Sequence, residues 1–311
     1  MRFEKETTSR PKLERTADRG EYASDRNLNF ENAKEKRDKV FAEAIKEKDF
    51  IGKENYSKED VNRDLQYVKE TEASFKKETD EDSKKIKELA QIFEAIICDQ
   101  GELANWFGES AVTVKSARYD DLKNGIDLII EFECDNPEDS RLALAVDITF
   151  DSFDKLHEKL DRIKRGVEEG KLSYVKYFNS EITKTKGDIR GIPKTVIGAD
   201  PKTLYKLMDL WVNEEEKKLE KHPIQFMILD QIMAQLTKFK ELAESGKKSF
   251  IAEKYGKVIE VVSRIIEEKQ DLREEVLGDD DSITMSDRVH REIIGYIENM
   301  GPQKGPRVWK Y

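Results

Sequence analysis

Residues 125–149, GIDLIIEFECDNPEDSRLALAVDIT, decide the fold of this chain. Apolar side chains recur at every second position on both sides of a polar stretch, a pattern typical of two β-strands joined by a turn. If Glu133 lies opposite Arg141 in the antiparallel hairpin, then Asp127 lies opposite Asp147, with both carboxylates on one side of the sheet. The sequence therefore predicts two acids that share one site.

The surroundings expected for Asp147 favour a functional role. This residue interrupts the otherwise apolar run LALAVDITF, residues 142–150, where a buried carboxylate is costly unless it is paired or bound to a metal. The same face carries Ala143 and Ala145, which are small enough to let the preceding helix pack close. Acids near strand ends are also commonly solvated or held in surface ion pairs, so a structural role for the two acids stays open.

The segment before the hairpin predicts a helix and a strand. Apolar residues recur at intervals of three and four from Ser83 toward Phe107, which indicates an amphipathic helix, and Gly108 is a stop signal. Residues 111–119 contain β-prone Val and Thr and predict a strand, whereas residues 120–125 predict a turn. Together with the hairpin, this makes a meander of three strands.

The segment after the hairpin predicts a return to helix and then to strand. Residues 152–170 have helical spacing and end at a glycine, and residues 172–178 have the composition of a strand. A strand, a helix and a strand in this order indicate a right-handed crossover between parallel strands. Residues 181–194 predict a basic loop, and residues 193–198 predict a further short strand. We therefore expect an α/β fold with a mixed sheet and an αβββαβ core flanked by helices.

The rest of the chain divides by composition. Charged residues make up 39% of the sequence and the mean hydropathy is −0.77. Residues 1–82 have too few apolar side chains for a packed core, which predicts a charged arm that is largely disordered or loosely helical, with helices expected within residues 30–50. Residues 83–220 predict the α/β domain. Residues 221–300 predict a helical region whose two apolar stripes pair as an αα-hairpin, and residues 301–311 an extended tail.

Composition also argues against several classes of protein. The net charge of −10 argues against a protein that coats nucleic acid non-specifically. No apolar stretch approaches the roughly 18 residues of a membrane span, so we expect a cytoplasmic protein without a membrane partner. The two cysteines lack CxxC spacing and the three histidines are scattered singly, so neither a disulfide scaffold nor a zinc site is expected. The sequence contains no P-loop, GxSxG, GxGxxG or HExxH motif.

The order of elements over residues 84–198, with acids on the second and third strands, resembles the PD-(D/E)XK, or restriction-endonuclease-like, nuclease superfamily. The resemblance implies that Asp127 is the first motif acid and Asp147 the second. It also implies that Glu94 or Glu102, both on the first predicted helix, assists them. The superfamily places a lysine two residues after the second acid, where this chain has Thr149.

The resemblance implies metal-dependent hydrolysis of a phosphodiester. Converging carboxylates bind a hard cation such as Mg²⁺ (or Mn²⁺), which activates a water for attack. Thr149 carries no charge, so another cation would have to stand near that water. Lys176 on the neighbouring predicted strand is the first candidate, and Lys155 at the start of the crossover helix is the second. The expected catalytic residues are Asp127, Asp147, Thr149, Lys176, Glu94 and Glu102, with Asp127 and Asp147 as the metal ligands.

We accordingly expect a Mg²⁺-dependent deoxyribonuclease whose partner is DNA in preference to RNA. One alternative is a nuclease-fold protein that binds nucleic acid without cleaving it, which would explain Thr149. Another is a helical interaction or scaffold protein that forms homo-oligomers through residues 224–268. Basic residues in and around residues 181–194 are compatible with phosphate contact, although a solvated loop in a lysine-rich chain is the preferred explanation.

Overall fold

The hairpin predicted from the sequence forms the centre of the fold. The computed structural model describes residues 28–75, 80–133, 142–150, 153–278 and 286–301. Strand β2 (Leu128–Phe132) pairs antiparallel with β3 (Leu142–Phe150), and Leu128 lies opposite Val146. This is the register that the sequence predicts, because it also sets Asp127 opposite Asp147. The predicted turn lies outside the described residues.

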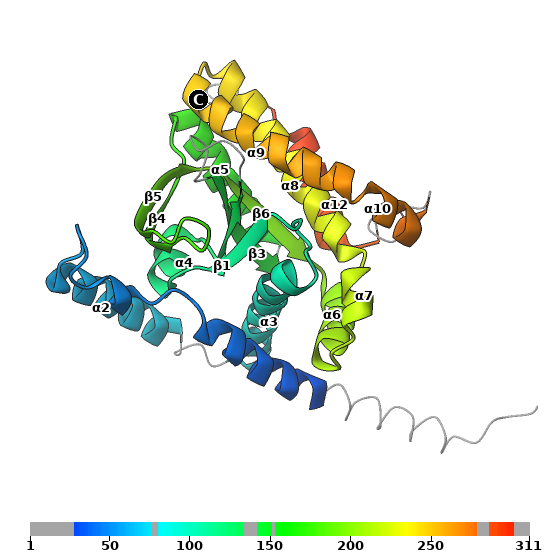
Figure 1. Ribbon diagram of the computed structural model, residues 1–311, viewed down its shortest axis with the longest axis horizontal. Coiled ribbons are helices and arrows are strands. Elements are labelled where there is room, and N and C mark those ends of the chain that lie inside the picture. The colour runs from blue at the N-terminus through cyan, green and yellow to red at the C-terminus, as the bar shows by residue number, and fades with distance from the viewer. Residues whose placement is uncertain (1–27, 76–79, 134–141, 151–152, 279–285, 302–311) are drawn as a thin grey trace, which may run out of the picture.

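A mixed sheet of four strands surrounds this hairpin in the order β1-β2-β3-β6 (Figure 1). Strand β1 (Ala111–Lys115) is antiparallel to β2, and β6 (Lys194–Ala199) is parallel to β3. Helix α3 (Glu81–Leu103) precedes the sheet in the chain, and α5 (Phe153–Glu169) follows β3. The chain is therefore a mixed α/β protein, as its sequence predicts.

The fourth strand of this sheet is not the one that the sequence favours. Residues 172–178 were expected to follow the crossover helix directly and pair with the sheet, but β4 (Ser173–Asn179) pairs instead with β5 (Lys186–Ile192) in a separate antiparallel sheet. Strand β5 occupies half of the predicted basic loop. Val175 and Phe178 of β4 pack against apolar residues on one face of the main sheet, so β4 covers that face and does not extend the sheet.

The two faces of the main sheet have different partners. Leu128, Ile130 and Val146 face a core that includes residues of α3, α5 and the C-terminal helices. Ala143 and Ala145 face the opposite way and pack with apolar residues of β4 and β5. The expectation that these alanines make room for α3 is therefore wrong, since the small β4–β5 sheet covers them.

The C-terminal third forms the helices that the periodicity predicts. Helix α6 (Pro201–Val212) begins after Asp200, whose side chain accepts a hydrogen bond from the Thr203 amide. The following helices are α7 (Glu216–Glu220), α8 (Ile224–Ser245), α9 (Ser249–Glu268), α10 (Gln270–Leu277) and α12 (Arg288–Asn299). Helices α8 and α9 lie side by side, and their apolar stripes are buried in the core that they share with the sheet (Figure 1).

Two glutamines of α8 close the free edge of β6. Gln235 accepts from the Val196 amide at 2.8 Å and donates to the Val196 carbonyl at 2.6 Å. Gln231 makes the same pair of bonds with Gly198, both at 2.9 Å. The side-chain amides thus satisfy the backbone groups that a further strand would otherwise bind.

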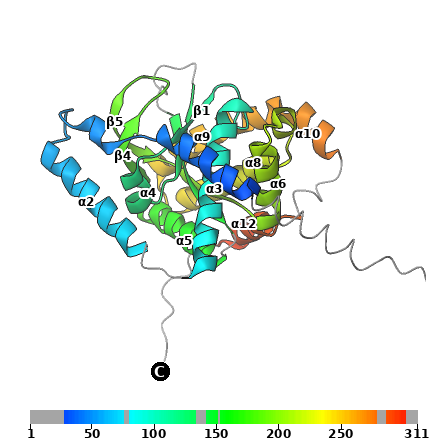
Figure 2. The same ribbon diagram turned by 90° about the horizontal axis from the view of Figure 1, so that it is seen from below.

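Part of the charged N-terminal arm is helical and lies against the domain. Residues 28–42 form a helix, and α2 (Lys58–Phe75) lies at the opposite end of the molecule from α10 (Figure 2). Ala33, Phe50 and Val61 are buried. Several apolar residues of residues 28–75 are therefore buried against the rest of the protein, whereas Leu28, Ile51 and Phe75 are exposed. Among the described residues, no helix is both long enough and apolar enough to span a membrane.

Candidate functional site

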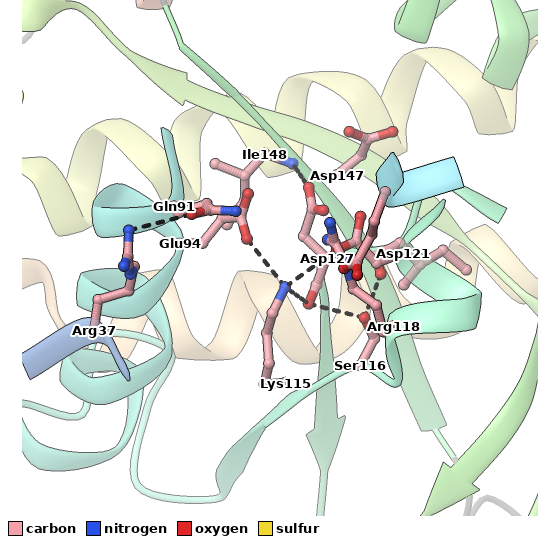
Figure 3. A network of polar contacts seen from close by, with 12 residues as sticks. Arg37, Gln91, Glu94, Lys115, Ser116, Arg118, Asp121, Asp127, Asp147 and Ile148 are labelled. Atoms are coloured by element: carbon pink, nitrogen blue, oxygen red, sulfur yellow. Dashed lines mark hydrogen bonds and ion pairs between the residues drawn. The ribbon is translucent and has the colours of Figure 1, made fainter. Parts of the chain in front are cut away.

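The two predicted acids lie together where β2 begins and β3 ends (Figure 3). The Asp127 carboxylate accepts a hydrogen bond from the Ile148 amide at 2.6 Å, which ties it to the residue next to Asp147. Asp127 is 7% exposed and Asp147 is 3% exposed. The pairing of the hairpin and this backbone contact together bring both carboxylates into one nearly water-free site.

Two lysines from different elements hold Asp147. Lys159 of α5 contacts one carboxylate oxygen at 2.5 Å, and Lys194 of β6 contacts the other at 2.9 Å. Lys159 also donates to the Ile148 carbonyl at 2.5 Å. Burial raises the pKa of Asp147, but the two ammonium groups more than offset this effect and leave the pKa below its ordinary value. Asp147 is therefore a carboxylate at neutral pH.

The third acid comes from α3 and is linked to the pair through a lysine. Lys115 Nζ contacts the Glu94 carboxylate at 3.0 Å and donates to the Asp127 carbonyl, also at 3.0 Å. Lys115 is itself buried, so each of these groups needs the other. Burial raises the pKa of Glu94, and the ammonium of Lys115 opposes that rise.

The surroundings of Asp127 disfavour its charged form. Burial raises its pKa well above the ordinary value, and the nearby charges of Glu94, Asp121 and Asp147 raise it further. One of its carboxylate oxygens, Oδ2, accepts from Ile148, while Oδ1 accepts no hydrogen bond from any described residue. A buried acid with a free oxygen among like charges is what a cation-binding position requires.

Gly125 lets the charged groups approach one another. Residues expected to form a turn make the short helix α4 (Arg118–Asn124), which ends at Gly125 in the left-handed conformation with φ of 62°. A Cβ on this residue would lie 3.2 Å from Arg162 Nη1, 3.2 Å from Asp147 Oδ2 and 3.2 Å from Lys194 Nζ. Both the backbone angle and the crowding therefore favour glycine.

The remaining predicted residues lie elsewhere or do other work. Glu102 is exposed near the end of α3 and accepts from the Thr113 amide. Lys176 is paired with Asp64 of α2 at 2.5 Å. Thr149 is buried on β3 next to Gly198, and its uncharged side chain supplies no positive charge near the acids. The structure thus brings Asp127, Asp147 and Glu94 together and does not add Glu102 or Lys176 to them.

The lysines that complete the site were missed from the sequence. Lys159 follows Lys155 by one helical turn and lies between the buried Leu156 and Leu160, a position that predicts a side chain at the border of the core. Lys194 is the first residue of β6, which runs parallel to β3. A basic residue at the start of this strand was the sequence signal that could have indicated its role.

The oxygen donors of the site suit a hard cation. Asp127 Oδ1 and the second oxygen of Glu94 accept no hydrogen bond within the described part of the chain, and carboxylate oxygens are the donors that Mg²⁺ and Mn²⁺ prefer. Lysine ammonium groups contact both oxygens of Asp147. Over the described residues, no three His, Cys, Asp or Glu side chains are arranged to hold a metal ion, so Asp147 would join the donors only by exchanging a lysine for the cation.

Comparison with protein-family models, with curated proteins and with solved structures found no match for this chain. The site consists of two buried acids at the start of β2 and on β3 and the half-buried Glu94 of α3, together with three lysines from β1, α5 and β6.

Proposed function

We propose that this chain is a Mg²⁺-dependent (or Mn²⁺-dependent) phosphodiesterase that cleaves DNA. Asp127 and Asp147 are the metal-binding acids and Glu94 assists them. Lys159 takes the role that the nuclease resemblance gives to the lysine missing at Thr149. The observation that carries the proposal is the 2.5 Å contact of Lys159 with Asp147, since it sets a cation from α5 beside the acid pair.

The residues of this chain divide the work in the proposed reaction. When bound, the metal would supply an activated water and offset negative charge on the leaving oxygen. Lys159 provides a positive charge that does not depend on the metal and that stabilises negative charge on the phosphate in the transition state. Lys194 fixes the orientation of Asp147, and Lys115 keeps Glu94 close to Asp127. Burial excludes bulk water from the acids and strengthens each of these interactions.

A second candidate function is nucleic-acid binding without cleavage. The observation that favours it is that lysine ammonium groups contact both oxygens of Asp147. A site that has exchanged its metal for lysines would retain the fold and would also tolerate Thr149. The two candidates differ in whether the acids respond to divalent metal.

Cleavage assays separate the two candidates. Plasmid and single-stranded DNA incubated with Mg²⁺ or Mn²⁺ are expected to be nicked, and Asp147→Asn or Lys159→Gln is expected to lower the rate by about 10²-fold or more. Two glutamates of α3 give a matched pair, because Glu94→Gln should lower the rate whereas Glu102→Gln, outside the site, should not. If the unsubstituted protein cleaves no DNA with either metal, the enzymatic proposal is refuted.

A further inference from the structure

One face of α5 carries three basic residues, of which only the middle one is paired with an acid of the site. Lys155, Lys159 and Arg162 recur at intervals of four and three, which places them within an arc of about 60° on the helix. Lys159 in the middle is paired with Asp147. Lys155 and Arg162 are exposed, and neither has an acidic partner or a hydrogen bond among the described residues. We call these three residues the α5 basic stripe.

The stripe adjoins the proposed reaction centre. Arg162 Nη1 and Asp147 Oδ2 each lie 3.2 Å from the position of a Cβ on Gly125, so the guanidinium lies near Asp147 without forming an ion pair with it. Asp161, the residue before Arg162, accepts from the Tyr296 hydroxyl of α12 at 2.5 Å, and among the described residues no ion pair joins Arg162 to Glu158 on the adjacent turn. The positive charge of Arg162 is therefore available to a ligand that approaches the site.

The spacing of the stripe fits a nucleic-acid strand. Arg162 follows Lys155 by seven positions, which is about 10 Å along the helix axis. Phosphates on one strand of a duplex advance about 3.4 Å per nucleotide, so the stripe spans about three nucleotides. A guanidinium binds a phosphate through two hydrogen bonds, and a lysine binds it as a point charge. The whole chain has a net charge of −10 and would repel a polyanion. A polyanion would therefore be held at a local basic surface such as this stripe.

From these observations we infer that the α5 basic stripe binds the phosphates on either side of the scissile group in a DNA strand, with Arg162 and Lys155 as its positioning residues. The inference rests on the proposed function for the place of the scissile phosphate, but not for the binding of DNA. Helix α5 would then supply both Lys159, the cation of the reaction centre, and the two residues that align the DNA strand.

The test measures binding in the absence of metal, so that cleavage plays no part. A fluorescein-labelled duplex of about 20 base pairs is titrated with protein in EDTA, and the dissociation constant is followed by anisotropy from about 50 to about 200 mM salt. Replacing Lys155 and Arg162 together by Gln removes two phosphate contacts, which should reduce the slope of log K against log salt by about 1.8. Over that salt range, the affinity of the unsubstituted protein should fall about twelvefold more than that of the variant.

The control removes the same charge from other surfaces. Lys217 on α7 and Lys247 between α8 and α9 are exposed and have no acidic partner in the described part of the chain, and their double replacement by Gln should leave the slope unchanged. Equal reductions in the two double variants, or no measurable binding by the unsubstituted protein, would overturn the inference. A lower slope in the α5 variant alone supports it, even if no metal elicits cleavage, in which case only the enzymatic proposal fails. All variants alter exposed side chains, and equal unfolding midpoints in urea would verify that they fold.

Discussion

Two neighbouring acids of the site should have opposite effects on stability when each is made neutral. Asp147→Asn removes the carboxylate that Lys159 and Lys194 share, at 2.5 Å and 2.9 Å, and an amide cannot compensate two ammonium groups. Breaking a buried ion pair from one side costs about 3 to 5 kcal/mol. Lys159 retains its bond to the Ile148 carbonyl, so we expect a loss of about 3 kcal/mol, at the lower end of that range.

Asp127→Asn should stabilise the fold at neutral and alkaline pH. The asparagine keeps an oxygen for the Ile148 amide, and it removes a carboxylate whose pKa is raised by burial and by the charges of Glu94, Asp121 and Asp147. An acid with a raised pKa in the folded state contributes stability that is fully present below its unfolded pKa and is lost as the pH rises through the folded pKa. Above that pH the substitution should add between about 0.5 and 2 kcal/mol.

The assay is urea unfolding at pH 8 in EDTA, followed by the fluorescence of the buried Trp106 and Trp211. With an m value of about 3 kcal/mol/M, the loss in Asp147→Asn lowers the midpoint by about 1 M. The midpoint of Asp127→Asn should lie above that of the unsubstituted protein and should approach it as the pH is lowered. Equal lowering of the midpoint by both substitutions, or an unchanged midpoint in Asp147→Asn, would contradict the opposite roles given to the two acids.

Three further substitutions test features around the site and the core. Burial lowers the pKa of His222 to about 4, and its Nδ1 accepts from the Ile224 amide. Because a depressed histidine pKa gives stability that is lost as the pH falls below about 6.5, the stability measured by urea unfolding should fall by about 2 kcal/mol more between pH 7 and pH 5 than it would without this histidine. His222→Gln should remove that difference, and an equal drop in the variant would contradict the assignment. Gly125→Ala should cost at least about 1 kcal/mol through its positive φ and lower the cleavage rate, whereas an unchanged melting temperature would show that the backbone relaxes freely. Gln235→Ala leaves the buried amide and carbonyl of Val196 without partners and should cost about 2 to 4 kcal/mol in thermal unfolding, a prediction that a loss below about 0.5 kcal/mol would exclude.

The hairpin was predictable because its information is local. Alternation with a period of two fixes which side chains share a face, and a one-residue slip would expose the apolar set. The same holds for α3, α5, α8 and α9, whose apolar residues recur at three and four. Asp127 and Asp147 could therefore be paired from the sequence alone.

The rest of the site depends on contacts that no local pattern specifies. Lys159 and Lys194 reach Asp147 only because α5 crosses beside the sheet and β6 pairs parallel to β3. Strand β4 has the same alternation whether it joins the main sheet or pairs with β5, so its composition could not decide between them. The N-terminal arm shows the same limit, since the Tyr56 hydroxyl finds the Lys176 carbonyl across 120 residues of sequence.

The glutamine pair on α8 has a consequence for how the sheet ends. Four residues of helix rise about 6.0 Å and two residues of strand about 6.6 Å, so a helix can follow a strand with side-chain amides for only one such step before the spacings diverge. The match covers Val196 and Gly198, which lie opposite Asp147 and Thr149 on β3. Helix α8 thus takes the place of a short additional strand beside β6, at the positions paired with Asp147 and Thr149. A chain cut before α8 would leave that edge open to pair with another molecule.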